Sequence, residues 1–415
     1  MKAVFGRPFT VGDTMSKKIS FGLALAMCIL CISATFAVTM IFSKSIYNSI
    51  ITNLSLRTSA SVALEEINEI VSNYFYGTVD DKTLTLTSSV VEGYVNGLGD
   101  SNSTYLTSEE FADYTTRLEG NFTGIGIETE FNSIKRQLNV AWVYEGSPAE
   151  TSGLKQGDII EEIDGVEVTY HNYEELSEKL NGGKLSGVEI VYNRDGDRNT
   201  VEPMMGFDIP TVTAKTLSGS IAYIRITAFY KDTPAEFKAR VEEMQKSGVV
   251  GFIIDLRGTS EGTLEYAAQT LDVLVPAPSG SQNLAATYDK NGNRLNVYTA
   301  ESGSVNSTYA VLVNSRTAGP AELFACDLRD ISGAKLVGSE TKGICTVQRA
   351  FPLENGEAVL LTVARIEPFN PEHDYNETGL IPDCPCDMTQ GESVNLWTLP
   401  VSEDAQLTQA ASLLK

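Results

Sequence analysis

The chain has 415 residues, enough for two or three folded units, and 42% apolar with 20% charged residues is typical of a globular protein. It carries 54 acidic and 31 basic side chains, for a net charge of −23. A surface with this much negative charge repels phosphate backbones, which excludes nucleic acid as the expected partner. Six cysteines and two histidines are too few for a disulfide scaffold or a histidine-rich metal site, so no metal or cofactor is expected.

An uncharged run of 24 residues from 19 to 42 predicts one transmembrane helix, because it would extend about 36 Å. A cleaved signal peptide is the alternative, but its apolar region is usually shorter. Four basic residues and one acidic residue precede the run, which predicts a cytoplasmic segment 1–18 with the remainder outside the membrane. Beyond residue 45 the chain retains 26 basic and 53 acidic groups, so the acidic excess belongs to the exported part.

Residues 43–118 are predicted to form a helical stalk, since apolar positions in 60–76 and 84–98 recur at helical spacing. Residues 119–205 contain short apolar runs separated by Gly and Asp, with a helix near 173–180, and this predicts a small β-rich domain. The stretches GNFTGIGIET and GSPAETSGLKQGDIIEEIDGVEV resemble a PDZ domain. The resemblance implies that Gly124, Ile125, Gly126 and Ile127 offer backbone N–H groups to a peptide's terminal carboxylate. The alternative is that these glycines only form a turn.

Residues 206–415 alternate apolar strands with amphipathic helices and predict an α/β domain with a buried, largely parallel sheet. Helices are expected at 234–246, 263–274 and 321–332, and in the C-terminal segment DAQLTQAASLL.

The order of anchor, helical stalk, PDZ domain and α/β domain resembles the carboxy-terminal processing peptidases. GLGDSNSTYLTSEEF, the stretch IAYIRI to FIIDLRG, and GLIPD match segments of that family. The resemblance implies an α/β peptidase core with an inserted PDZ domain, and a serine nucleophile with a lysine general base.

Neither member of that dyad is present. The family's nucleophile motif reads NSRTAGPAEL here, with Gly319 at the nucleophile position, and its lysine motif reads VGSETKGICTVQ, with Ile344 at the lysine position. Pro320 has no N–H for the oxyanion, and Glu261 replaces a glycine of the oxyanion turn, where a carboxylate would oppose negative charge. Gln348 and Asp330 match family positions near the dyad and are expected to be scaffold.

Two substitutes for the dyad remain open. Thr317 and Lys342 each lie two residues upstream of the vacated positions and could form a shifted pair. The second substitute would be a cysteine nucleophile, Cys345 or Cys326, with His373 as its base. Buried free cysteines, however, usually behave as small hydrophobes. Cys326 and Cys345 could also form a disulfide, and Cys384 and Cys386 are a weak metal signal.

The expected function is therefore that of a membrane-anchored, extracytoplasmic pseudopeptidase that binds protein or peptide C-termini, and an active peptidase relative is a further candidate partner. The alternatives are an active serine-type peptidase using Thr317 and Lys342, and a structural protein with an internally filled groove. A bacterial envelope is the expected location.

Overall fold

The computed structural model describes residues 86–414, except for 121, 183–185, 218–219, 278–279, 302–304, 306, 355 and 390–395, and also Thr35, Thr39 and Met40. The chain divides into two units, Met1–Thr85 and Leu86–Lys415, of which the second is described here. Apart from those three residues, the expected transmembrane run lies outside the described residues, as does the expected helix at 60–76. No helix within the described ranges is long and apolar enough to cross a bilayer.

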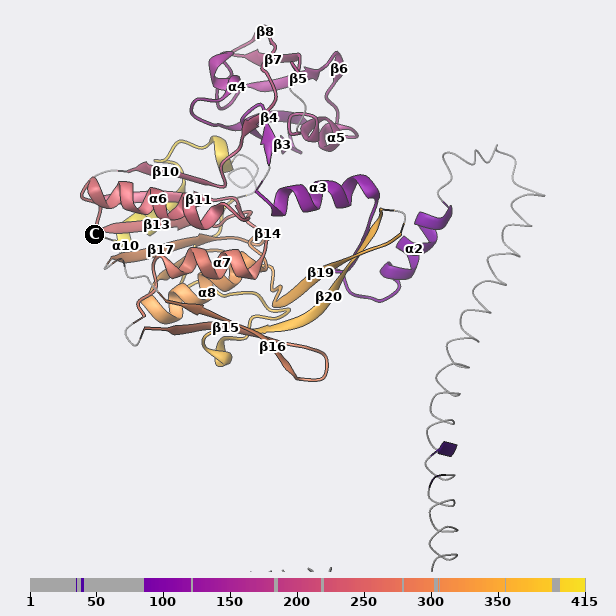
Figure 1. The fold of residues 1–415 in the computed structure, drawn as a ribbon. Helices are drawn as coiled ribbons and strands as arrows, with labels where there is room; N and C mark the ends of the chain where they lie inside the picture. The colour runs from indigo at the N-terminus through magenta and orange to yellow at the C-terminus, as the bar shows by residue number, and fades with distance from the viewer. Residues whose placement is uncertain are drawn as a thin grey trace, which may run out of the picture. The chain divides into compact units, whose positions relative to one another are not determined.

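A six-stranded sheet forms the centre of the α/β part, in the order β10-β11-β13-β17-β18-β21 (Figure 1). Every neighbouring pair is parallel except β10 with β11, which confirms the expected largely parallel sheet. The inner strands β11, β13 and β17 are almost entirely buried and mainly apolar, as expected when helices cover both faces. The strands are β10 (Val212–Thr216), β11 (Ile221–Ile226), β13 (Gly251–Asp255), β17 (Thr308–Val313), β18 (Lys335–Gly338) and β21 (Cys384–Pro385).

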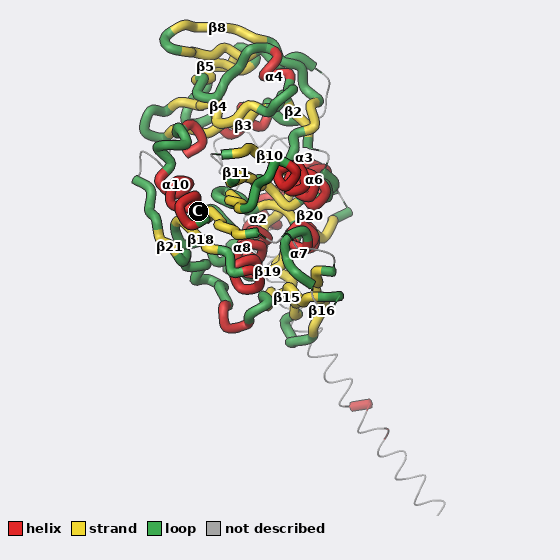
Figure 2. Tube along the Cα trace, turned by 90° about the vertical axis from the view of Figure 1, so that its left-hand side faces the viewer, coloured by secondary structure: helices red, strands yellow, loops and turns green. Residues whose placement is uncertain are grey.

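Helices cover both faces of this sheet (Figure 2). Three of them pack on one face over residues such as Ile224 and Ile254, and the C-terminal helix packs on the other over Ile253 and Leu312. The four helices lie within two residues of their expected starts and ends because their apolar positions recur at helical spacing. They are α6 (Thr233–Lys246), α7 (Leu264–Asp272), α8 (Pro320–Ser332) and α10 (Ala405–Leu413).

The PDZ-like segment forms a second six-stranded, antiparallel sheet with its own buried core. Its strand order is β3-β4-β5-β7-β8, and β6 pairs with β5, so among the described residues β3 has a single strand neighbour, β4. The elements are β3 (Ile127–Asn132), β4 (Gln137–Val143), α4 (Pro148–Thr151), β5 (Ile159–Ile163), β6 (Val166–Glu167), α5 (Tyr173–Glu178), β7 (Ile190–Arg194) and β8 (Asp197–Val201), with β2 (Thr123–Gly124) paired to β9 (Phe207–Asp208).

A five-stranded sheet, which the sequence patterns did not predict, joins the N-terminal segment to the α/β part. The β19–β20 hairpin extends toward α2, and β1 pairs with β20, so part of the expected stalk also forms sheet structure (Figure 1). The elements are α2 (Leu86–Asn96), β1 (Thr104–Leu106), α3 (Ser108–Leu118), β15 (Gln282–Tyr288), β16 (Arg294–Ala300), β19 (Thr346–Pro352) and β20 (Ala358–Glu367). Two short strands, β12 (Ala228–Phe229) and β14 (Glu261–Gly262), and two 3₁₀ turns, Pro371–His373 and Leu396–Thr398, complete the described structure.

Candidate functional site

Gly319 occupies the sharp turn between β17 and α8, at the carboxyl edge of the parallel sheet. Its backbone has φ 55° and ψ −114°, a conformation that side-chain-bearing residues rarely adopt. A Cβ added there would meet no heavy atom within 4 Å. A strained strand-to-helix turn is the local structure that exposes a nucleophile in many hydrolases. The turn is therefore retained, and it has room for a side chain that glycine does not supply.

Glu322, in the first turn of α8, connects the two vacated positions. Its Oε2 accepts hydrogen bonds from the N–H of Gly319 (2.9 Å) and of Ile344 (2.8 Å), and its Oε1 accepts from Gly343 N–H (2.7 Å) and the Thr341 hydroxyl. The side chain is fully buried. Burial raises the pKa of the Glu322 carboxyl, and its four hydrogen-bond donors oppose that rise. Glu322 thus holds the turn and the lysine-position loop together without either catalytic side chain.

The oxyanion positions carry groups that are poorly suited to stabilising negative charge. Pro320 is the first residue of α8 and has no N–H to donate. In the opposing turn, the Gly258 N–H donates to Asn314 Oδ1 at 3.0 Å. The Glu261 carboxylate accepts a hydrogen bond from the Tyr230 hydroxyl and lies 3.9 Å from Arg117. Its identified partners are therefore these two side chains rather than a group at the vacated dyad.

The shifted pair lacks an available hydroxyl. Thr317 is fully buried, and its Oγ1 donates to the Leu256 carbonyl at 2.8 Å while accepting from Asn314 N–H at 3.0 Å. Lys342 is exposed, and its backbone N–H donates to the Thr317 carbonyl at 3.0 Å. The backbones of the two residues are therefore adjacent, but the Thr317 hydroxyl already donates and accepts hydrogen bonds within the fold.

The two buried thiols are also unsuited to nucleophilic attack, which requires thiolate. Burial raises the pKa of the Cys345 thiol to about 12, and burial beside Asp327 raises that of Cys326 further. His373 Nδ1 lies 2.7 Å from Asp330 Oδ2. Cys326 and Cys345 are both free thiols in the structure, so no disulfide joins them.

The remaining family-matched residues make structural contacts. Gln348 Nε2 donates to the hydroxyls of Thr346 (2.9 Å) and Thr362 (3.4 Å) on the β19–β20 hairpin. Asp330 pairs with Arg329 at 2.9 Å, three turns of α8 beyond Gly319. No cluster of three His, Cys, Asp or Glu side chains suitable for a metal occurs in the part of the chain that the structure describes.

In the PDZ-like segment, residues 124–127 contact their own chain closely. The Ile125 N–H donates to the Leu180 carbonyl at 3.1 Å, so this amide, which was expected to bind a carboxylate, has an internal partner. A Cβ at Gly126 would lie 2.2 Å from Ser147 Cβ, and one at Gly124 would lie 2.7 Å from Leu180 O. The glycines are thus required by packing within the domain, whether or not a ligand binds.

Two cavities lie beside β3. A cavity of roughly 380 Å³, which we call the inner cavity, is lined by Ile127, Ser177 and Leu180 on the PDZ-like side and by Tyr230 on the other. Between β3 and α5, Thr129 Oγ1 lies 3.2 Å from Ser177 Oγ, and the Phe131 ring stacks on Tyr173 at 4.1 Å. These contacts keep β3 and α5 close together in the structure.

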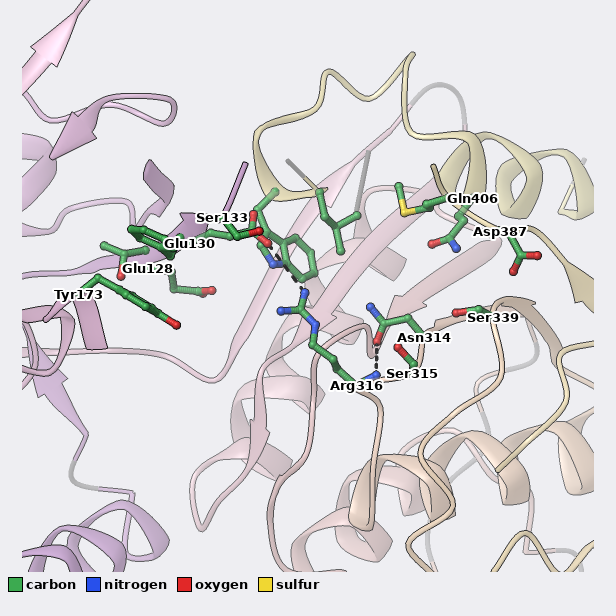
Figure 3. A pocket seen from close by; sticks show the side chains of 15 residues that line it. Glu128, Glu130, Ser133, Tyr173, Asn314, Ser315, Arg316, Ser339, Asp387 and Gln406 are labelled. Atoms are coloured by element: carbon green, nitrogen blue, oxygen red, sulfur yellow. Dashed lines mark hydrogen bonds and ion pairs between the residues drawn. The ribbon is translucent and has the colours of Figure 1, made fainter. Parts of the chain in front are cut away.

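The larger cavity, roughly 870 Å³, we call the outer cavity. It is bounded by β3 and Tyr173 on one side and by the loop after β17 on the other (Figure 3), and Trp397 also lines it. Nearby, Arg225 of β11 forms a two-pronged ion pair with Glu128 of β3, at 3.0 and 2.7 Å, and its guanidinium stacks 3.8 Å from the Trp397 ring. This pair attaches β3 to the main sheet.

Glu130 extends toward Arg316 across the outer cavity (Figure 3). Burial raises the pKa of the Glu130 carboxyl to about 7, although Arg316, the Trp397 backbone N–H and Arg225 favour its charged form; neighbouring Glu128 adds to the rise. The folded state therefore binds this proton more tightly than the unfolded chain does. Its stabilising effect is complete below about pH 4.5 and is lost as the pH rises through about 7.

This linkage predicts a pH-dependent effect of Glu130→Gln. From pH 4.5 to 8, the unfolding free energy of the native protein should fall by about 1–3 kcal/mol more than that of the variant. Urea unfolding of both proteins at several pH values measures the difference. Parallel pH profiles would contradict the raised pKa, and Glu242→Gln, an exposed change on α6, is the control.

The sequence did not single out Glu130, Arg316, Arg225 or Trp397. Their proximity depends on contacts between segments far apart in the chain, such as Glu128 with Arg225, 97 residues away. The sequence offered one weak signal, the charged residues within the apolar strands IETEF and IAYIRI. A charged side chain that is buried in such a strand is costly unless it is paired.

Comparison with known proteins agrees with this architecture. Residues 220–386 match the profile of peptidase family S41, and residues 140–191 match that of the PDZ domain. The carboxy-terminal processing protease CtpA of Bacillus subtilis is 31% identical over 250 residues, which are 60% of this chain and 53% of that protein. The carboxyl-terminal-processing protease of Synechocystis is 25% identical over 313 residues, 74% of this chain and 71% of the relative. The alignment with CtpA thus spans about half of that relative's length.

A putative S41 protease from Bacteroides fragilis has a similar fold, with a TM-score of 0.57 and 18% identity over 81% of this chain and 92% of that one. At this identity the likeness supports the fold alone. The sequence matches confirm the resemblance drawn from the motifs: the chain is a member of the carboxy-terminal processing peptidases of family S41, and it carries a PDZ domain.

Proposed function

We propose that this protein is a pseudopeptidase, which binds polypeptide C-termini through its PDZ domain and does not cleave them. The observation that carries the proposal is Gly319, which occupies the nucleophile turn with open space in place of a side chain. Ile344 at the base position cannot take up a proton. A glycine turn and an isoleucine supply neither the nucleophile nor the base that acyl transfer requires.

The loss of the oxyanion donor adds to this argument. One such donor is typically worth about 10²–10³ in rate, and Pro320 removes the one that follows the nucleophile position. Thr317 would have to give up its bond to the Leu256 carbonyl before it could act as a substitute. The active-peptidase alternative therefore has only the backbone proximity of Thr317 and Lys342 in its favour.

Peptide capture is supported by one edge of β3, which pairs with no strand in the part of the chain that the structure describes. An edge strand offers unpaired backbone groups to an added strand, which is how PDZ domains hold a peptide. The inner cavity lies beside Ile127 and Leu180, whose apolar side chains could contact a terminal side chain, although charged groups such as Glu128 also line it. For a peptide to enter, the Thr129–Ser177 and Phe131–Tyr173 contacts must separate, which lowers the net affinity.

We extend the proposal to location and partners from the sequence alone. The uncharged run at 19–42 would anchor the protein in a cell membrane, with the acidic domains outside, in a bacterial envelope. A protein that binds tails without cutting them could act beside an active peptidase relative or sequester exported proteins.

Fluorescence anisotropy with the detergent-solubilised full chain tests the binding half of the proposal. Peptides with a free C-terminus are expected to bind saturably, and the same peptides with a C-terminal amide to bind at least about tenfold more weakly. Equal binding of acid and amide, or no saturable binding, would support a structural role with an internally filled groove. A fluorophosphonate probe should leave the protein unlabelled while labelling an intact relative.

A further inference from the structure

The outer cavity has no assigned role in the proposed capture of a C-terminus. It adjoins β3 beyond the inner cavity, and both cavities are lined by Glu128 and Thr129. A peptide that adds antiparallel to β3, with its carboxylate near Ile127, would therefore extend its upstream residues toward the outer cavity. At roughly 3.3 Å per residue, the four steps from Ile127 to Phe131 span about 13 Å.

The outer cavity contains a carboxylate with incomplete partners. The Glu130 side chain is only 12% exposed, and its Oε2 atom is buried without a hydrogen-bond partner among the described residues. The Arg316 guanidinium lies 3.9 Å away, beyond the roughly 2.7–2.9 Å of a well-formed charge-assisted hydrogen bond. Arg316 is itself 57% exposed and therefore able to move into solvent.

The other charges favour a positive ligand. Asp387 adds a third carboxylate to the lining, beside Glu130 and Glu128, and Arg225 is already paired with Glu128 at 2.7 Å. Phe131, Tyr173 and Trp397 supply aromatic surface, and ring faces attract cations. Arg225 already stacks on Trp397, which illustrates that preference within the same structure.

We propose that the outer cavity binds a lysine or arginine side chain of the captured polypeptide, with Glu130 as its acceptor and Arg316 displaced into solvent. The inference rests on the proposed PDZ capture and specifies its substrate class: tails with a basic residue about four positions before the C-terminus. Arg316 then acts as an internal competitor, since it occupies the approach to Glu130 when no ligand is bound.

The test uses the full chain and peptides that differ at one position. Lysine, norleucine or glutamate is placed at the third, fourth or fifth residue from a free C-terminus, and anisotropy is measured at pH 8, where the Glu130 carboxyl is ionised. At one of these positions, lysine is expected to bind about tenfold more tightly than norleucine, and glutamate more weakly.

Two variants should change this preference in opposite directions. Glu130→Gln should abolish the advantage of lysine over norleucine while norleucine peptides still bind, and Arg316→Gln should increase that advantage severalfold. Glu242→Gln on α6 and Arg349→Gln on β19, both exposed, are the charge-matched controls and should leave it unchanged. Thermal unfolding of each variant verifies that it is folded.

The outcomes separate the two proposals. If norleucine peptides bind and lysine gives no advantage, or if the advantage survives Glu130→Gln, the cation site is refuted and peptide capture stands. A preference for glutamate that is lost in Arg316→Gln would show instead that the outer cavity takes an anion. If none of the peptides binds, capture and the cation site both fail.

Discussion

The triple variant Gly319→Ser, Pro320→Ala, Ile344→Lys is expected to hydrolyse peptides about 10²–10³ times faster than the double variant that keeps Pro320. The double variant restores the nucleophile and base but leaves the oxyanion without the N–H that follows the serine. Alanine supplies this N–H without adding bulk at the first residue of α8. The result would attribute the proposed lack of activity to three positions in an otherwise retained fold.

The geometry favours such a reconstruction. A serine Cβ at position 319 meets no heavy atom within 4 Å, and Glu322 holds both backbone positions through hydrogen bonds of 2.9 and 2.8 Å. The positive φ of 55° should cost the serine variant about 1–3 kcal/mol of stability. Strain of this kind is common at active sites.

Initial rates of product formation, followed by mass spectrometry on an unstructured protein substrate, measure the effect. Gly319→Ala, Pro320→Ala, Ile344→Lys is the matched control, since it lacks only the hydroxyl. A triple variant no faster than this control would mean that further features of the site have been lost.

Glu322→Ala is expected to destabilise the protein by about 3–5 kcal/mol, the largest stability effect that we predict for a single substitution. It removes the acceptor of three backbone N–H groups and the Thr341 hydroxyl, and buried donors without partners are costly. Glu322→Gln should be milder, because its amide oxygen still accepts bonds while its NH₂ group faces donors.

Denaturant unfolding of both variants, beside Glu242→Ala on the exposed face of α6, checks this expectation. The control should lie within about 0.5 kcal/mol of the native protein. A loss below about 1 kcal/mol for Glu322→Ala would show that water or a rearranged loop replaces the carboxylate. A large loss would show that Glu322 stabilises the fold whether or not the site is catalytic.

Local patterns predicted the α/β part well and the contacts between segments poorly. The apolar runs of β11, β13 and β17 and the amphipathic period of α6 and α8 determine these elements almost independently of their surroundings. The β15–β16 and β19–β20 hairpins were not predicted because polar and charged residues interrupt their alternation and several of their positions are half-buried.

In the candidate site, too, local motifs could be predicted from the sequence and contacts between distant segments could not. Gly319 and Ile344 could be located from their flanking motifs, since these motifs encode a strand, a turn and a helix in short stretches. The link from Ile125 N–H to the Leu180 carbonyl could not be predicted, because it depends on how α5 packs against β2 and β3. Glu130 is similar: its raised pKa arises from burial against segments far away in sequence.

Incubating the purified full chain with peptides that have free C-termini, with binding and product masses read from the same wells, distinguishes a pseudopeptidase from an active peptidase. The expectation for a pseudopeptidase is saturable binding with no products, and no change in product formation for Thr317→Ala or Lys342→Ala. Products formed by the native protein that disappear in Lys342→Ala would contradict it, and would mean that the catalytic pair has moved along the chain rather than been lost.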